Sequence, residues 1–113
     1  MIKVPWQLEE AVALFDLYFK SGSKLSVPAE KINELSLIYR RRAEQLGMIV
    51  DDKFRNVSGL RMQLGCIHYV VTDGAKGMSG ASKLFYETYE LYKVQPEIFN
   101  MILNEFNFRY KNK

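Results

Sequence analysis

Arg61, Gly65 and His68 stand at i, i+4 and i+7 within the segment 54–71, a spacing that places side chains in one row along an α-helix. A guanidinium binds phosphates and guanine edges, an imidazole can donate or accept a hydrogen bond, and a glycine lets a ligand approach the backbone. The row therefore predicts an exposed contact ridge. Gln63 lies at its margin, where it could add a polar contact.

The opposite face of this expected helix is apolar. Its residues recur at intervals of three and four and are Val57, Leu60, Leu64, Ile67 and Val71. Asn56 or Ser58 could cap the start of the helix, where free N–H groups attract anions. We expect the helix to bury the apolar face and to present the ridge, so that Gly65→Glu should weaken ligand binding with little change in stability.

The middle of the chain is also its basic part. Between residues 40 and 83 there are eight lysines and arginines but four acidic residues, against a net charge of +3 for the whole chain. This asymmetry favours association with a polyanion, although an ordinary solvated surface would look the same. The predicted nucleic-acid contacts are Arg41, Arg42, Arg55, Asn56, Arg61, Gln63, His68, Lys76 and Lys83.

Several of these residues also have a purely structural interpretation. Arg41 and Arg42 lie near the end of an expected helix, where cations stabilise the negative dipole end. Arg55 and Asn56 could cap the next helix and fix its preceding loop. Both interpretations remain open from the sequence.

Catalysis has little support. Cys66 and His68 are two positions apart, so on a helix they point about 200° away from each other. The glycine-rich segment 72–82 lacks the spacing of a phosphate-binding loop. A lone histidine and a lone cysteine do not predict a metal centre, so we expect no enzyme, metal or cofactor, and we expect the Cys66 thiol to be partly covered and unreactive.

Apolar periodicity and helix-ending residues predict five helices. The first runs to about Lys20 with Pro5 in its first turn, the second from about 26 to 46, and the third is the segment 54–71. The last two span about 81–93 and 95–106. The expected fold is mainly α, with helices two and three in a helix-turn-helix-like arrangement and little strand, the most strand-like pieces being 48–50 and 68–71.

Length and composition fit one domain over 1–113, with 1–4 and 109–113 frayed. The chain is 48% hydrophobic and 13% aromatic, enough for a single core. One cysteine and the lack of a long apolar run predict a cytoplasmic protein without a membrane span. The aromatic residues of helix four are expected in the core, and the wide apolar face of helix five could support a homodimer.

Three short motifs resemble a known family. They are Trp6-x-x-Glu9-Glu10, Glu34-Leu35-Ser36 and Phe54-Arg55-Asn56, followed by the segment 59–64 and the glycine/serine segment 77–83. In this order they resemble the small helical module at the N-terminus of many bacterial HNH-type and McrA-like restriction endonucleases. The resemblance covers about residues 4–90 and implies a DNA-associated accessory module without catalytic activity.

Two functions are consistent with these patterns. The first is a non-catalytic DNA-binding module of a restriction or defence nuclease system, with the basic middle of the chain as its contact surface. The second is a protein-interaction module, such as a small phage-borne inhibitor of a defence nuclease. The aromatic last two helices fit the second function.

Overall fold

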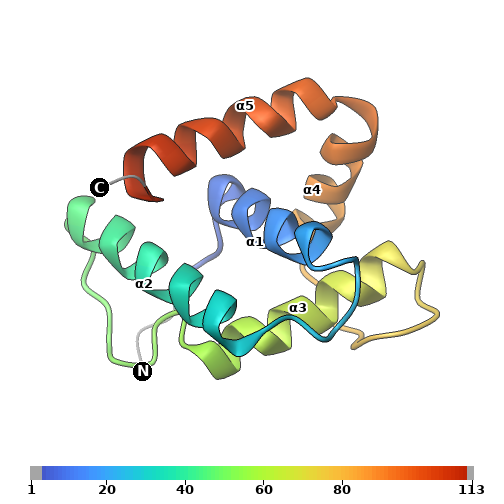
Figure 1. Cartoon of the computed structure of the whole chain (residues 1–113), viewed down its shortest axis with the longest axis horizontal. Helices are drawn as coiled ribbons and strands as arrows, with labels where there is room; N and C mark the ends of the chain where they lie inside the picture. Colours follow the sequence, from blue (N-terminus) through green and yellow to red (C-terminus); the bar gives the residue numbers. More distant parts are fainter. Residues whose placement is uncertain (1–3, 112–113) are drawn as a thin grey trace.

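A computed structural model describes residues 4–111 and contains five α-helices and no strand in that part of the chain. They are α1 (Leu8–Lys20), α2 (Ala29–Gln45), α3 (Val57–Val71), α4 (Lys83–Val94) and α5 (Pro96–Phe106), and α5 continues into a π-helical turn, η1 (Asn107–Lys111). They form one compact domain with extents of 37 × 31 × 25 Å (Figure 1). The predicted mainly helical fold is confirmed.

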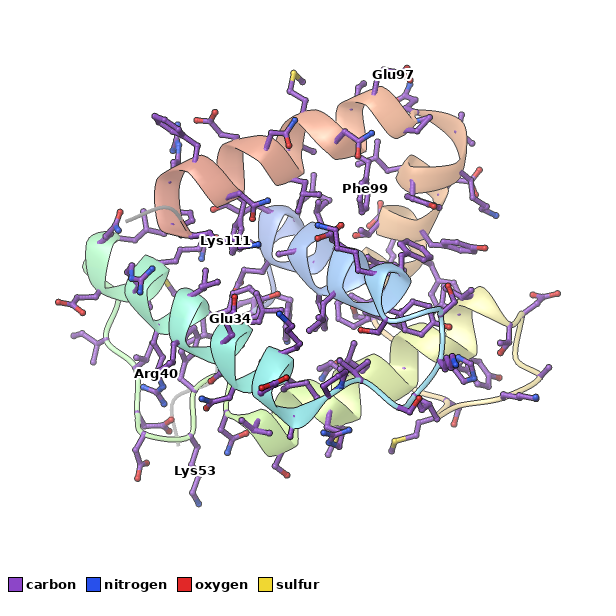
Figure 2. The ribbon with its side chains drawn as sticks, viewed as in Figure 1. Glu34, Arg40, Lys53, Glu97, Phe99 and Lys111 are labelled. Carbon is purple, nitrogen blue, oxygen red and sulfur yellow. The ribbon has the colours of Figure 1, made fainter. Side chains whose placement is uncertain are left out.

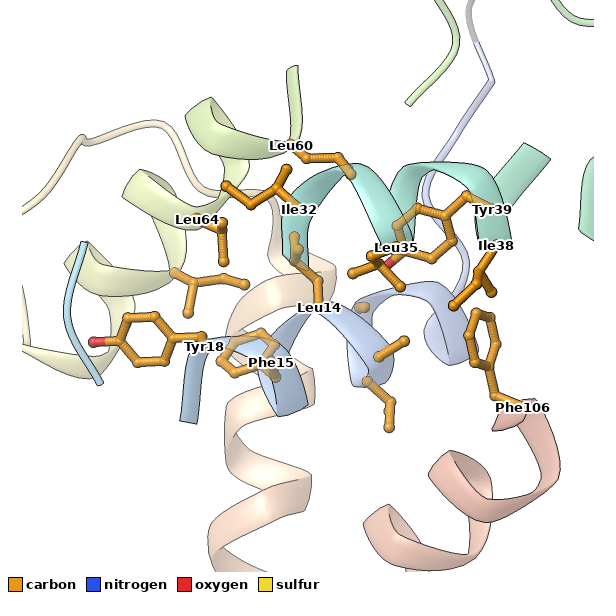
Figure 3. Close-up of a cluster of buried hydrophobic side chains, with 14 of the residues drawn as sticks. Leu14, Phe15, Tyr18, Ile32, Leu35, Ile38, Tyr39, Leu60, Leu64 and Phe106 are labelled. Atoms are coloured by element: carbon orange, nitrogen blue, oxygen red, sulfur yellow. The ribbon is translucent and has the colours of Figure 1, made fainter. Parts of the chain in front are cut away.

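The domain is built around α1, against which each of the other four α-helices packs. Residues 11–15 of α1 are all buried, and Val12, Leu14 and Phe15 have no exposed surface. A helix with such a wide apolar face must be covered by several neighbours. In Figure 3, Leu14 lies among the inward side chains of α2 and α3, and Phe15 lies beside Tyr18. The segment that the sequence pattern singles out is α3, but α3 lies at one side of α1.

Aromatic side chains fill the space between α1 and α4. Phe15 meets the ring of Phe85 edge to face at 5.9 Å and stacks on Tyr89 at 6.2 Å, and Phe19 stacks on Tyr92 at 4.2 Å. Such pairs add to the stability gained from apolar burial. Phe85 is therefore in the core as the sequence predicts, Tyr89 is partly buried against it, and Tyr92 stays 38% exposed.

The helices begin later than the sequence suggests. Gln7 and Glu10 form a reciprocal capping box, so α1 starts at Leu8 and Pro5 stays outside the helix. Pro28 precedes α2 instead of lying within it. Asn56 caps α3 through a hydrogen bond from the Gly59 N–H (2.8 Å), which leaves residues 54–55 in a turn.

Two other local expectations differ from the structure. Residues 68–71 are helical and 48–50 form no strand. The connector 46–56 between α2 and α3 is far longer than the turn of about 3–4 residues in a helix-turn-helix. The two helices pack against each other, but the chain joins them by this longer connector.

The chain end is also more ordered than predicted. Tyr110 in η1 is buried against Phe106, and its carbonyl oxygen accepts a hydrogen bond from Arg41 Nη1 at 2.6 Å. This bond ties η1 to the last turns of α2. The expected fraying of 109–113 therefore does not apply to 109–111, and residues 1–3 and 112–113 lie outside the described part.

Candidate nucleic-acid interface

The Arg55 side chain lies inside the domain. Its Nε is 2.9 Å from Glu10 Oε2, its Nη2 is 3.1 Å from Glu10 Oε1, and the two carboxylate oxygens are thus held by one guanidinium. The guanidinium also lies over the rings of Trp6 (4.3 Å) and Phe54 (4.6 Å) and donates to the carbonyl oxygens of Val4 and Pro5. Arg55 is therefore structural and does not contribute to an external surface.

Arg42 shares Glu10 with Arg55 and also pairs with Glu9. Its side chain is 3% exposed, its Nε is 2.5 Å from Glu9 Oε1, its Nη1 is 3.8 Å from Glu10 Oε1, and its Nη2 donates to the Gln7 side chain. Two buried arginine side chains thus face buried Glu10 and partly exposed Glu9, and the four charges balance. Arg42 is also removed from the predicted contact set, because its hydrogen-bonding groups are already used.

The motifs that carry the family resemblance converge on this network. Ser36 Oγ donates to the Arg55 carbonyl oxygen at 2.6 Å, which holds Arg55 in a left-handed conformation (φ +46°). Tyr39 Oη donates to the Glu10 carbonyl oxygen at 2.6 Å, and burial, reinforced by Glu10, raises the pKa of Tyr39 well above its ordinary value. The short motifs are far apart in sequence, and their shared task is to join α1, α2 and the start of α3.

The predicted ridge on α3 is covered by the glycine-rich segment 72–82. The Met78 N–H donates to the Gly65 carbonyl oxygen at 3.1 Å, and a Cβ added at Gly65 would lie 3.1 Å from the Met78 sulfur. Gly77 approaches so closely that a Cβ there would lie 2.5 Å from the same carbonyl oxygen. Gly65 is therefore buried and serves packing of the loop, so the expectation that Gly65→Glu would leave stability unchanged is wrong.

The His68 side chain is also hydrogen-bonded within the domain. Its Nδ1 is 2.6 Å from Tyr18 Oη, and that hydroxyl lies 3.1 Å from the Ser23 carbonyl oxygen. A hydroxyl has one proton to donate, so the tautomer of His68 sets which of these two contacts the Tyr18 hydroxyl donates to. This chain joins α3, α1 and the loop after α1, so the exposed ridge reduces to Arg61 and the loop laid beside it.

Arg61, Lys76 and Lys83 remain as exposed cations of the predicted set. None of the salt bridges within residues 4–111 involves them, and Arg61 makes only a long hydrogen bond (3.4 Å) to the Val27 carbonyl oxygen. Lys76 is held beside the end of α3, because its N–H donates to Thr72 Oγ1 (3.0 Å). These three side chains, with half-buried Gln63, form the candidate interface.

The remaining predicted residues lie elsewhere. Arg41 is bound to η1 at the far end of α2, so it does not join the α3 surface. Asn56 is used as a helix cap. Met78, which is 49% exposed between the cations of the loop, was not predicted, although the glycines on either side of it are the sequence sign of a close backbone approach.

Cys66 lies on the covered side of α3 and is 6% exposed. Burial raises the pKa of its thiol, which lowers the fraction of reactive thiolate. We expect a thiol reagent to label the native protein roughly a hundredfold more slowly than the unfolded protein, the factor for a local opening that costs about 3 kcal/mol. The measurement is the labelling rate with and without denaturant, and equal rates would show that the thiol is open to solvent.

Comparison of the chain with protein-family models, curated proteins and solved structures gave no match. Within residues 4–111 no helix is long and apolar enough to cross a membrane. The same residues include no group of three His, Cys, Asp or Glu side chains that could hold a metal ion. The resemblance to the nuclease-associated module stays a prediction from the motifs.

Proposed function

We propose that the protein is a non-catalytic DNA-binding module whose contact surface is the outer side of α3 together with the loop 72–82. The observation that carries this proposal is the glycine-rich loop docked on α3, which leaves Lys76, Met78 and Lys83 exposed, while no salt bridge within residues 4–111 involves Arg61, Lys76 or Lys83. A cationic surface of this kind attracts phosphates, and a rigidly held loop can enter a groove. A role in a restriction or defence nuclease system is proposed from the motif resemblance.

The spacing of the cations suits a duplex. Arg61 lies near the start of α3 and Lys76 is fixed beside Thr72 at its end, so they are separated by roughly 16 Å of helix. The major groove of B-DNA is about 12 Å wide between its phosphate rows. Arg61 and Lys76 can thus face phosphates on either side of a groove, while Met78 and the loop backbone approach the base edges between them.

The proposal predicts a specific salt dependence. Binding of a fluorescent duplex, followed by anisotropy across a salt series, should weaken as salt is raised because each neutralised phosphate releases counterions. A plot of the logarithm of the binding constant against the logarithm of the salt concentration has a negative slope. The combined variant Arg61→Ala/Lys76→Ala/Lys83→Ala should make this slope less steep by roughly 2–3. Arg61→Ala alone should make it less steep by about 1 if its contact is to a phosphate, or should relax sequence preference if its contact is to a base.

Arg109→Ala is the matched control. Arg109 is an exposed cation on η1, at the other end of the molecule from the loop (Figure 1), and its side chain is 58% exposed. Its removal should leave the slope unchanged. A triple variant that keeps its melting temperature and binds like the parent, or a parent that binds neither duplex nor single strand at low salt, would rule out this interface.

A further inference from the structure

A second surface of the domain is a groove beside α1, away from the proposed DNA-binding loop. It has a volume of about 460 Å³ and lies between α2 and the end of α5, with α1 as its floor. Its apolar lining comes from all three helices and consists of Ala13, Leu17, Leu35, Ile38, Leu103 and Phe106. Leu17 is partly exposed here, and its neighbours in the groove belong to the core or border it. The groove therefore opens the core to solvent at one place.

The arrangement of the helices explains why this groove exists. Both α2 and α5 pack on α1, and α5 meets α2 near its end, where the rings of Phe106 and Tyr39 lie edge to face at 5.9 Å. They come together at one end, where η1 contacts α2 and Arg41 binds the Tyr110 carbonyl oxygen, and they separate toward the loop 21–28 (Figure 1). The result is a wedge with one closed end and an apolar floor.

The rim of the groove is basic. Four lysines line it, Lys20, Lys24, Lys31 and Lys111, against two carboxylates, Asp16 and Glu34. Asp16 pairs with Lys20 at 3.0 Å, and Glu34 only approaches Lys31 at 4.0 Å. In Figure 2, Glu34 and Lys111 approach the groove from α2 and from the end of the chain. Cations thus surround the floor from four separate segments.

We infer that this groove binds a short acidic amphipathic helix of another protein. An apolar floor with walls formed by two helices is the geometry in which an amphipathic helix places its apolar face. The lysines come from α1, the loop 21–28, α2 and η1, so they fit several carboxylates on both sides of an apolar stripe better than the single head group of a small amphiphile. Charge complementarity of this kind selects the partner and speeds its binding.

The size of the groove sets the size of the partner. The α1 residues that line it run from Ala13 to Lys20, roughly 10 Å of helix. A helical stretch of about two turns within the partner would span this length. Leucines at i, i+3, i+4 and i+7 would contact Leu17 and its neighbours, and glutamates beside them would approach the lysines.

A synthetic peptide with this pattern of leucine and glutamate is the probe. We expect isothermal titration calorimetry to show one peptide per chain, and we expect amide shifts in nuclear magnetic resonance spectra to concentrate on the groove residues. Lys24→Glu/Lys31→Glu should weaken binding by about tenfold, since two attractions become repulsions. Leu17→Glu should weaken it at least as much, because it adds both charge and bulk to the floor.

Lys53→Glu is the matched control for charge. Lys53 lies in the connector 46–56, outside the groove lining (Figure 2), and its reversal should leave peptide binding unchanged. A second peptide with lysine in place of glutamate should not bind. Equal weakening by Lys53→Glu, amide shifts centred on α3 or the loop 72–82, or no binding by a folded parent would each overturn the inference.

The same variants separate a second copy of this chain from a foreign partner. Glu87, Glu90 and Glu97 give the α4–α5 surface an acidic side of its own. If sedimentation of the parent shows self-association that Lys24→Glu/Lys31→Glu abolishes, the groove holds another copy and the assignment to a foreign helix is wrong. A monomeric parent that binds the acidic peptide supports the assignment.

Discussion

Replacement of Glu10 by alanine is expected to lower the free energy of unfolding by about 3–5 kcal/mol, the usual cost of removing one member of a buried ionic network. Glu10 is 1% exposed and is the carboxylate that contacts both Arg42 and Arg55. Without it, one buried guanidinium loses its only acidic partner among residues 4–111 and the other keeps only Glu9. Urea unfolding of parent and variant measures the change.

Glu105→Ala supplies the comparison. Glu105 also pairs with an arginine, Arg109, at 2.7 Å, but both side chains are more than half exposed. A surface pair of this kind contributes about 0–1 kcal/mol, so this variant should unfold nearly like the parent. If the two variants lose similar amounts, the network around Glu10 does not have the energetic role given to it here.

Gly77→Ala is expected to detach the loop 72–82 from α3. Gly77 has φ +92°, and a Cβ there would lie 2.5 Å from the Gly65 carbonyl oxygen and 2.6 Å from the Tyr69 nitrogen. Both atoms belong to the backbone of α3 and cannot shift independently of the helix. Together with about 1–2 kcal/mol of backbone strain, this clash should make the docked loop unfavourable.

Three measurements follow the loop. Hydrogen exchange should show loss of protection at the Met78 amide, which donates to Gly65 in the docked state. The free energy of unfolding should fall by roughly 1–3 kcal/mol, because the loop can leave while the helical core persists. If the proposed DNA surface is correct, the salt-dependent affinity should fall as well, since Lys76 is no longer held beside α3.

Gly80→Ala separates strain from clash. Gly80 also has a left-handed conformation, φ +104°, but a Cβ there would meet no atom within 4 Å. This variant should retain protection at Met78 and bind as the parent does, apart from a small loss of stability. Equal loss of protection in the two variants would mean that backbone strain alone, and not contact with α3, controls the loop.

Much of the fold followed from local patterns. The five helices, their apolar faces and the restart of the chain at Pro96 were readable because these depend on residues only a few positions apart. The predicted first residues of the helices were less accurate. The side-chain caps at Gln7 and Asn56 set where α1 and α3 begin, and the apolar pattern does not show these caps.

The candidate site was harder to predict from the sequence. Arg55 and Arg61 are both arginines within the same basic stretch, yet Arg55 binds Glu10, which is far away in the sequence, and Arg61 remains exposed. Helical spacing relates residues only a few positions apart, so it cannot predict the pairing of Arg55 with Glu10. Helical spacing likewise predicted an exposed Gly65 opposite the apolar face, and it could not show that Met78 would cover this residue.

The amino-acid sequence by itself determined a helical chain with a basic middle, because composition and periodicity are local properties, and its short motifs predict a resemblance to a nuclease-associated module. The tertiary structure alone decided that α1 is the centre, that Arg42 and Arg55 pair with Glu9 and Glu10, and that a lysine-rimmed groove stays open between α2 and α5. These features arise where segments distant in sequence meet. Burial of a charge requires a partner, and only the packed chain shows which partner each charge has found.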